Sequence, residues 1–230
     1  CAGKNTTTGK YNLALGTGAF QDGTVTGNYN IAFGYGAGYK VCSGTRNFFG
    51  GYLAGHCVTT GSDNVFIGHQ AGCLEIDATN NVYIGKQAGQ CATSGEGNTF
   101  LGYLAGKGNS SSGVTGEYNV AVGAGALCTL SSGSRNIALG NDALSGTTTG
   151  TDNVALGSGA AKASGSSHTV AIGKDAGCNS GEAAGVFIGK YAGKAANSHG
   201  ASIMIGCKAG CLAYVADSSI FIGKEAGMRA

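Results

Sequence analysis

The feature that most constrains the fold is a short phrase that repeats along the whole chain. Thirteen three-residue runs, largely apolar, each end on a glycine that we call the anchor glycine. Consecutive anchors lie 16 to 18 residues apart, except for one interval of 21, and an alanine follows every anchor by three residues. The anchors are Gly16, Gly34, Gly51, Gly68, Gly85, Gly102, Gly123, Gly140, Gly157, Gly173, Gly189, Gly206 and Gly223.

A repeat of this length limits the chain to very few architectures. Helical repeats need more than about 30 residues per unit, whereas about 17 residues suit one coil of a β-solenoid. The apolar runs are rich in β-branched and aromatic residues, which favour strands. No segment shows ten residues of helical periodicity. The sequence therefore predicts an all-β protein, a parallel β-solenoid (β-roll) of about 13 coils in a single repeat domain, 1–230.

The apolar runs also predict which side chains lie inside the coil. The first and third residues of a run, such as Val82 and Ile84, share one face of a strand, and we expect them in the core. The middle residue points the other way and is also apolar, which predicts burial on both faces. Either a second layer of the coil covers this middle row or another chain does. We expect an oligomer interface at Phe49, Phe66, Tyr83, Phe100, Phe187, Met204 and Phe221.

Asparagine stands four residues before nine of the anchors. Stacked at one position per coil, such amides can form a hydrogen-bonded ladder along the solenoid, or bond to the backbone of their own turn. We expect a structural ladder rather than a row of ligand contacts. Its members are Asn12, Asn30, Asn47, Asn64, Asn81, Asn98, Asn119, Asn136 and Asn153.

The residues that carry chemistry do not form a catalytic pattern. The four histidines occupy non-equivalent loop positions, and no carboxylates recur in the facing pair that a glycosidase needs. Glu75 and Asp77 are expected to be solvated charges in one loop. Charged residues are 11% of the chain, with a net charge of +2 and no basic block, which argues against nucleic acid as a partner. We predict no enzyme activity, no cofactor, no metal and no membrane span.

The repeat resembles the head repeats of trimeric autotransporter adhesins and of related phage tail fibres. The pattern N-x-h-h-G-x-x-A-G, where h is apolar, is carried by NIAFGYGAG (30–38), NVAVGAGAL (119–127), NIALGNDAL (136–144) and NVALGSGAA (153–161). The resemblance covers essentially the whole chain. It implies a left-handed β-roll wound into a homotrimer that acts as an extracellular stalk or adhesive head.

Nine cysteines, an odd number, suggest disulfides with one thiol left over. Neighbouring coils place residues within the Cα distance that a disulfide tolerates, so Cys73–Cys91 and Cys42–Cys57 are candidate pairs. The alternative is that the cysteines are small buried apolar residues at a corner. Cys207 and Cys211 lack the partners of a zinc site. The disulfide candidates are Cys1, Cys42, Cys57, Cys73 and Cys91, with Cys1 suited to a bond with another chain.

Two functions remain open from the sequence. The first is a non-enzymatic structural fibre, extracellular or virion-associated, that assembles into a homo-oligomer or, through ends that lack capping elements, into a head-to-tail filament. The second is a host-attachment adhesin that binds cell-surface glycans or proteins through its loops. An adhesin needs a non-repeating cluster at one place, and the insertion in 107–116 is the sequence feature that suggests one.

Overall fold

The computed structural model describes residues 2–109, 113–163, 165–180, 184–196, 201–213 and 218–228. These residues form an all-β parallel β-solenoid with thirteen strands and no helix, as the repeat predicted. The chain divides into two compact units, an N-terminal unit (Cys1–Tyr118) and a C-terminal unit (Asn119–Ala230). Each unit is described by itself.

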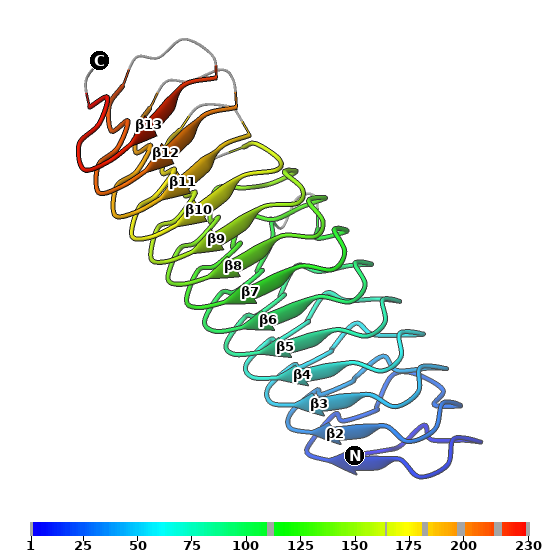
Figure 1. Cartoon of the computed structure of the whole chain (residues 1–230). Coiled ribbons are helices and arrows are strands. Elements are labelled where there is room, and N and C mark those ends of the chain that lie inside the picture. Colours follow the sequence, from blue (N-terminus) through cyan, green and yellow to red (C-terminus); the bar gives the residue numbers. More distant parts are fainter. Residues whose placement is uncertain are drawn as a thin grey trace. The chain divides into compact units, whose positions relative to one another are not determined.

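Within each unit, every coil contributes one three-residue strand that pairs in parallel with the strand of the next coil (Figure 1). The N-terminal unit holds β1 (Leu13–Leu15), β2 (Ile31–Phe33), β3 (Phe48–Gly50), β4 (Val65–Ile67), β5 (Val82–Ile84) and β6 (Thr99–Leu101). The C-terminal unit holds β7 (Val120–Val122), β8 (Ile137–Leu139), β9 (Val154–Leu156), β10 (Val170–Ile172), β11 (Val186–Ile188), β12 (Ile203–Ile205) and β13 (Ile220–Ile222). The coils are numbered by their strands.

The anchor glycines are required by the close stacking of successive corners. Gly68 has a φ of +134°, and a Cβ there would lie 2.5 Å from the carbonyl oxygen of Gly85 in the next coil. Such an approach leaves no room for any side chain, and a φ of this size is one that glycine adopts readily.

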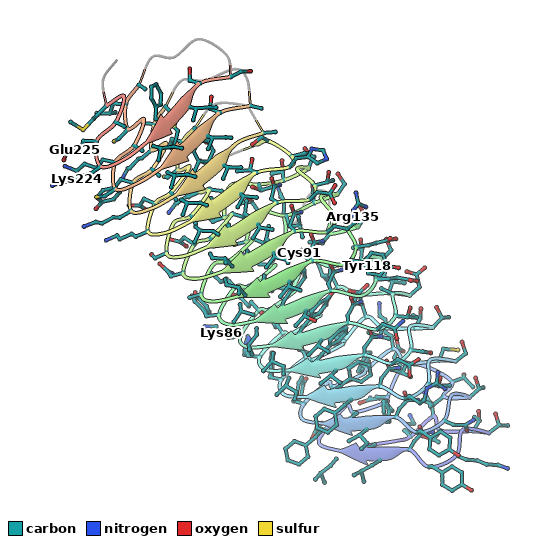
Figure 2. All side chains as sticks on the ribbon, in the orientation of Figure 1. Lys86, Cys91, Tyr118, Arg135, Lys224 and Glu225 are labelled. Atoms are coloured by element: carbon teal, nitrogen blue, oxygen red, sulfur yellow. The ribbon has the colours of Figure 1, made fainter. Side chains whose placement is uncertain are left out.

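In Figure 2 the N-terminal unit carries Lys86 at the corner that follows its strands and Tyr118 on the side that precedes them.

The strands face the opposite way from our expectation. The middle residues of the runs point into the coil, whereas the first and third residues point outward. Because the core is filled by one row of large side chains, the oligomer interface that we predicted at the middle row is wrong. Phe49, Phe66, Tyr83, Phe100, Phe187 and Met204 are each 0% exposed, and Phe221 is half-buried.

In ten of the thirteen coils, the residue four positions after the anchor complements the middle residue in size, whereas in coils 2, 9 and 10 both residues are small. Gly72 follows the coil of Phe66, and a Cβ on it would lie 2.5 Å from Cδ2 of that ring. In coil 8 the middle residue is instead Ala138, and the corresponding position holds Leu144, which is fully buried. Each of these coils therefore places one large side chain in its interior. A small middle residue is likewise paired with a large buried residue after the anchor at Ala14 with Phe20 and at Ala121 with Leu127.

The asparagines form the ladder that their spacing suggested. Asn64 illustrates the geometry: its Oδ1 accepts the backbone N–H of Asn81 at 3.0 Å, and its Nδ2 donates to the carbonyl of Ala78 at 2.9 Å. Both bonds tie one coil to the next. In the C-terminal unit the ladder ends where Oδ1 of Asn153 accepts the backbone N–H of Thr169 at 2.8 Å. Each buried amide thus satisfies backbone groups that the three-residue strands leave unpaired.

Candidate functional site

The most extensive candidate site is the outward face of the strands. We call the first and third residues of the strands the outward rows. None of the strands contains a charged residue. The most exposed outward residues are Leu13, Leu15, Phe33, Phe48, Ile67 and Leu101 in the N-terminal unit, and Ile137, Leu139, Ile172, Ile203, Ile220 and Ile222 in the C-terminal unit.

These rows make an apolar surface of functional size. The six residues of the N-terminal unit expose 36–57% of their surface, from Phe48 to Phe33. Aromatic side chains bury roughly 150–250 Å² each, and with about the lower part of that range applied to all six, they together expose on the order of 500 Å². An exposed apolar patch of roughly 300–600 Å² is often functional in a monomer. The outward rows are therefore a candidate interaction surface in each unit.

A second candidate site is a hollow of about 560 Å³ in the N-terminal unit. It lies at the corner that follows strands β1, β2 and β3, and we call it the tyrosine hollow. Its lining combines three tyrosines with a histidine, two polar side chains and two glycines. The lining residues are Thr17, Gly18, Gln21, Tyr35, Gly36, Tyr39, Tyr52, Leu53 and His56.

The hollow lies where two successive coils have glycine at one corner position. The residue two after the anchor has a positive φ in every coil of the N-terminal unit. Coils 3 and 4 fill this position with Leu53 and Gln70, whereas coils 1 and 2 have Gly18 and Gly36. A Cβ on Gly18 would make ordinary van der Waals contacts at 3.5 Å, whereas a Cβ on Gly36 would lie 2.7 Å from Cδ2 of Leu53.

Two short aromatic stacks form the walls of the hollow. Tyr35 stacks on Tyr52 with ring centroids 5.4 Å apart, and Tyr39 stacks on His56 at 4.9 Å. The tyrosines of the first stack come one residue after their anchors, and Tyr39 and His56 come five after theirs. His56 looks isolated in the sequence because its spacing from Tyr39 does not reveal that the two rings stack.

The lining of the hollow carries no carboxylate, lysine or arginine. Its only titratable base is His56. Burial lowers the pKa of His56 below its usual value of about 6.5, and the nearby positive charge of Lys40 lowers it further, while Asp22 opposes this. His56 is therefore neutral at pH 7, and the hollow suits an uncharged ligand.

A buried carboxyl group is the other feature that sequence analysis missed. Glu75 is 0% exposed, which contradicts the solvated charge that we expected, whereas Asp77 is exposed. It occupies the core position that Val58 holds in the preceding coil, seven residues after the anchor. Its Oε2 accepts the hydroxyl of Tyr83 at 3.3 Å, and its Oε1 has no hydrogen-bond partner. Burial raises the pKa of Glu75 to about 8.

The cysteines do not pair in the structure. Cys42, Cys57, Cys73, Cys91, Cys128, Cys178, Cys207 and Cys211 are all free thiols, and Cys1 lies outside the described residues. The register explains one missing pair: the backbone N–H of Cys42 bonds to Thr59 in the next coil, two residues beyond Cys57. Cys73 and Cys91 are also one position out of register, counted from their anchors. The predicted disulfides are therefore not formed in this structure.

Thiol reactivity should follow burial along the chain. Burial, with smaller effects of Cys57 and Cys91, raises the pKa of Cys73 to about 11, which suppresses the reactive thiolate. We expect iodoacetamide at pH 8 to label exposed Cys207 at least tenfold faster than Cys73 in the folded protein. Peptide mass spectrometry measures both rates. Equal rates in the folded state, rather than only after unfolding in guanidinium, would contradict the burial of Cys73.

The described ranges contain no group of three or more His, Cys, Asp or Glu side chains that could hold a metal ion. In the same ranges, no helix is long and apolar enough to cross a membrane. Comparison with known protein families, curated proteins and solved structures finds no significant match. The candidate sites are therefore judged on their geometry alone.

Proposed function

We propose that the chain is a structural β-solenoid module without enzymatic activity, which associates with further copies of itself through the outward rows. The observation that carries this proposal is the uncharged apolar face of the strands. A standard interface takes about 800 Å² from each partner, and the outward rows of one unit supply over half of that area. A second copy suits this face because it presents the same uncharged rows in return.

A fibre outside the cell or on a virion is the setting in which such a module fits. The repeat pattern NVAVGAGAL (119–127) and its equivalents resemble adhesin heads and tail fibres, which supports that setting. The solenoid itself supplies rigidity, because strand pairing joins each coil to the next within its unit and the asparagine ladder adds to it in the coils that carry asparagine.

The test of self-association is a charged pair placed on the outward rows. Leu15 and Phe33 are partners in the β1–β2 register, so the variant Leu15→Lys/Phe33→Glu carries opposite charges that pair with each other across the strands. We expect sedimentation velocity to show a loss of the oligomer, with at least a tenfold weaker association. The charges oppose burial against an apolar partner, while the coil keeps its core.

The matched control places the same charges on exposed apolar residues outside the strands. Leu74 and Ile76 are 40% and 46% exposed in the loop after β4. Leu74→Lys/Ile76→Glu should leave association unchanged. If the control and the outward variant weaken association equally, or if neither does, the outward rows are not the interface.

A second candidate function is favoured by the tyrosine hollow. An adhesin that binds cell-surface glycans needs a non-repeating site, and the hollow is such a site within the N-terminal unit because Gly18 and Gly36 differ from the residues at this position in coils 3 to 6. Residues 110–112 of the insertion that first suggested a binding loop lie outside the described residues. The hollow therefore supports the adhesin function more directly than the insertion does.

A further inference from the structure

We propose that the tyrosine hollow is a binding site for a neutral saccharide, one or two sugar rings in size. This inference deepens the adhesin function and does not depend on self-association through the outward rows. It rests on the volume of the hollow, the tyrosine rings that line it and the absence of charge from its lining.

The hollow has the dimensions of a small-ligand site. Its volume of about 560 Å³ lies within the range of roughly 300–1,000 Å³ in which proteins hold small molecules. It is also preformed, because the backbone of Gly18 and Gly36 is fixed by the corner geometry that all coils of the unit share. A ligand therefore meets a cleft that requires no rearrangement of the backbone.

The two aromatic stacks of the hollow do not continue into coil 1. Tyr35 uses one face to stack on Tyr52, and Tyr39 uses one face to stack on His56. The corresponding positions in coil 1 hold Thr17 and Gln21, which carry no ring. The stacks therefore end at coil 2, where Tyr35 and Tyr39 line the hollow.

A sugar ring matches this combination of surfaces. One side of a pyranose presents C–H groups that pack on an aromatic face, and its rim presents hydroxyls that both donate and accept hydrogen bonds. The hydroxyl of Thr17, the amide of Gln21 and the tyrosine hydroxyls supply both donors and acceptors at the edge of the hollow. A purely apolar ligand would leave these groups without partners.

The absence of charge excludes acidic saccharides as the preferred ligand. No lysine or arginine lines the hollow to pair with a carboxylate or sulfate, and the nearest cation that acts on His56 is Lys40, outside the lining. Desolvating an unpaired anion beside the tyrosine rings costs free energy that nothing in the lining restores. Neutral hexoses and N-acetylhexosamines remain as the matching class.

Saturation-transfer NMR with maltose, cellobiose, lactose and chitobiose tests the proposal, with 3′-sialyllactose as the acidic comparison. We expect at least one neutral disaccharide to show saturation transfer at millimolar concentration, with at least a tenfold weaker affinity for sialyllactose. Absence of transfer to all four neutral disaccharides at 10 mM would overturn the proposal.

Two variants locate the binding. Gly18→Gln places a side chain in the lining of the hollow; the φ of Gly18 is 79°, against 57° for Gln70 at the same corner position of coil 4. Tyr35→Ala removes one ring face, and Tyr103→Ala removes a tyrosine from the same position of coil 6, outside the hollow. We expect at least a tenfold loss of affinity in the first two variants and none in Tyr103→Ala.

Binding that survives both Gly18→Gln and Tyr35→Ala would place the saccharide elsewhere and overturn the assignment to the hollow. Urea unfolding of each variant identifies any that fail to fold. Sedimentation velocity on the same samples separates this result from self-association: the hollow variants should keep the wild-type oligomer, and Leu15→Lys/Phe33→Glu should keep saccharide binding.

Discussion

Exchanging a large and a small core residue within one coil should preserve the stability that each single substitution would strongly reduce. Phe66→Ala alone should lower the free energy of unfolding by about 3–5 kcal/mol, because it leaves a cavity in the core. Gly72→Leu alone should cost at least about 3 kcal/mol, since even a Cβ at Gly72 meets the ring of Phe66. Combined, the two substitutions reproduce the pair that Ala138 and Leu144 form in coil 8.

We therefore expect the double variant to be within about 2 kcal/mol of wild type, which corresponds to a coupling energy of at least about 4 kcal/mol from urea unfolding. The backbone permits the exchange, because Leu144 has a φ of 51° and Gly72 one of 55°. Phe66→Ala combined with Gly193→Leu in the other unit is the control, and its two effects should add. Additive losses in Phe66→Ala/Gly72→Leu would show that the middle row is not the core.

The buried carboxyl of Glu75 should make the N-terminal unit lose stability as pH rises. Its pKa is about 8 in the folded chain against 4.5 for the free side chain, because burial penalises the ionised form. The folded state therefore binds the proton more tightly than the unfolded state does. The stabilising contribution of protonated Glu75 to the free energy of unfolding is complete below about pH 4.5 and is lost as pH rises through about 8.

The total loss should be on the order of 5 kcal/mol, at about 1.4 kcal/mol for each unit of the pKa difference between 4.5 and about 8. Tyr83 and Asp77 are the titratable groups that act on Glu75, and both belong to the same unit. Urea unfolding between pH 5 and 9 should show a slope that Glu75→Gln removes. Asp77→Asn, an exposed neighbour, should keep the slope. Parallel profiles for wild type and Glu75→Gln would contradict the burial of an ionisable group.

The period of the sequence was sufficient to predict the solenoid and the position of each strand. Each anchor glycine follows its strand directly, as Gly68 follows β4 (Val65–Ile67), because the next corner leaves no room for a side chain. The asparagine ladder was also predictable, since one residue type at one position per coil aligns automatically when coils stack.

The alternation of apolar residues could not predict which face of each strand points into the coil, because both faces of each run are apolar. The sequence does hold a signal that decides it. Where the middle residue is large, as at Phe66, glycine follows four residues after the anchor, and where it is Ala138, that position holds Leu144. Two positions that exchange volume must share one interior, and this relation places the middle row inside the coil.

The two local sites were missed for a related reason. Aligning the repeats by their anchors puts Glu75 in the same column as Val58, which the structure buries, whereas its neighbours in the loop suggested a solvated charge. The tyrosine hollow depends on the path of the corner, which brings positions one and five after the anchor together. Sequence spacing alone does not give that path.

The most direct test of the proposed function is the mass of the wild-type protein in solution, measured by light scattering with and without reductant. The outward rows predict a discrete multiple of the 22.5 kDa chain mass that reductant does not change, because the described cysteines are unpaired. A protein that remains a 22.5 kDa monomer at high micromolar concentration would contradict self-association through the outward rows.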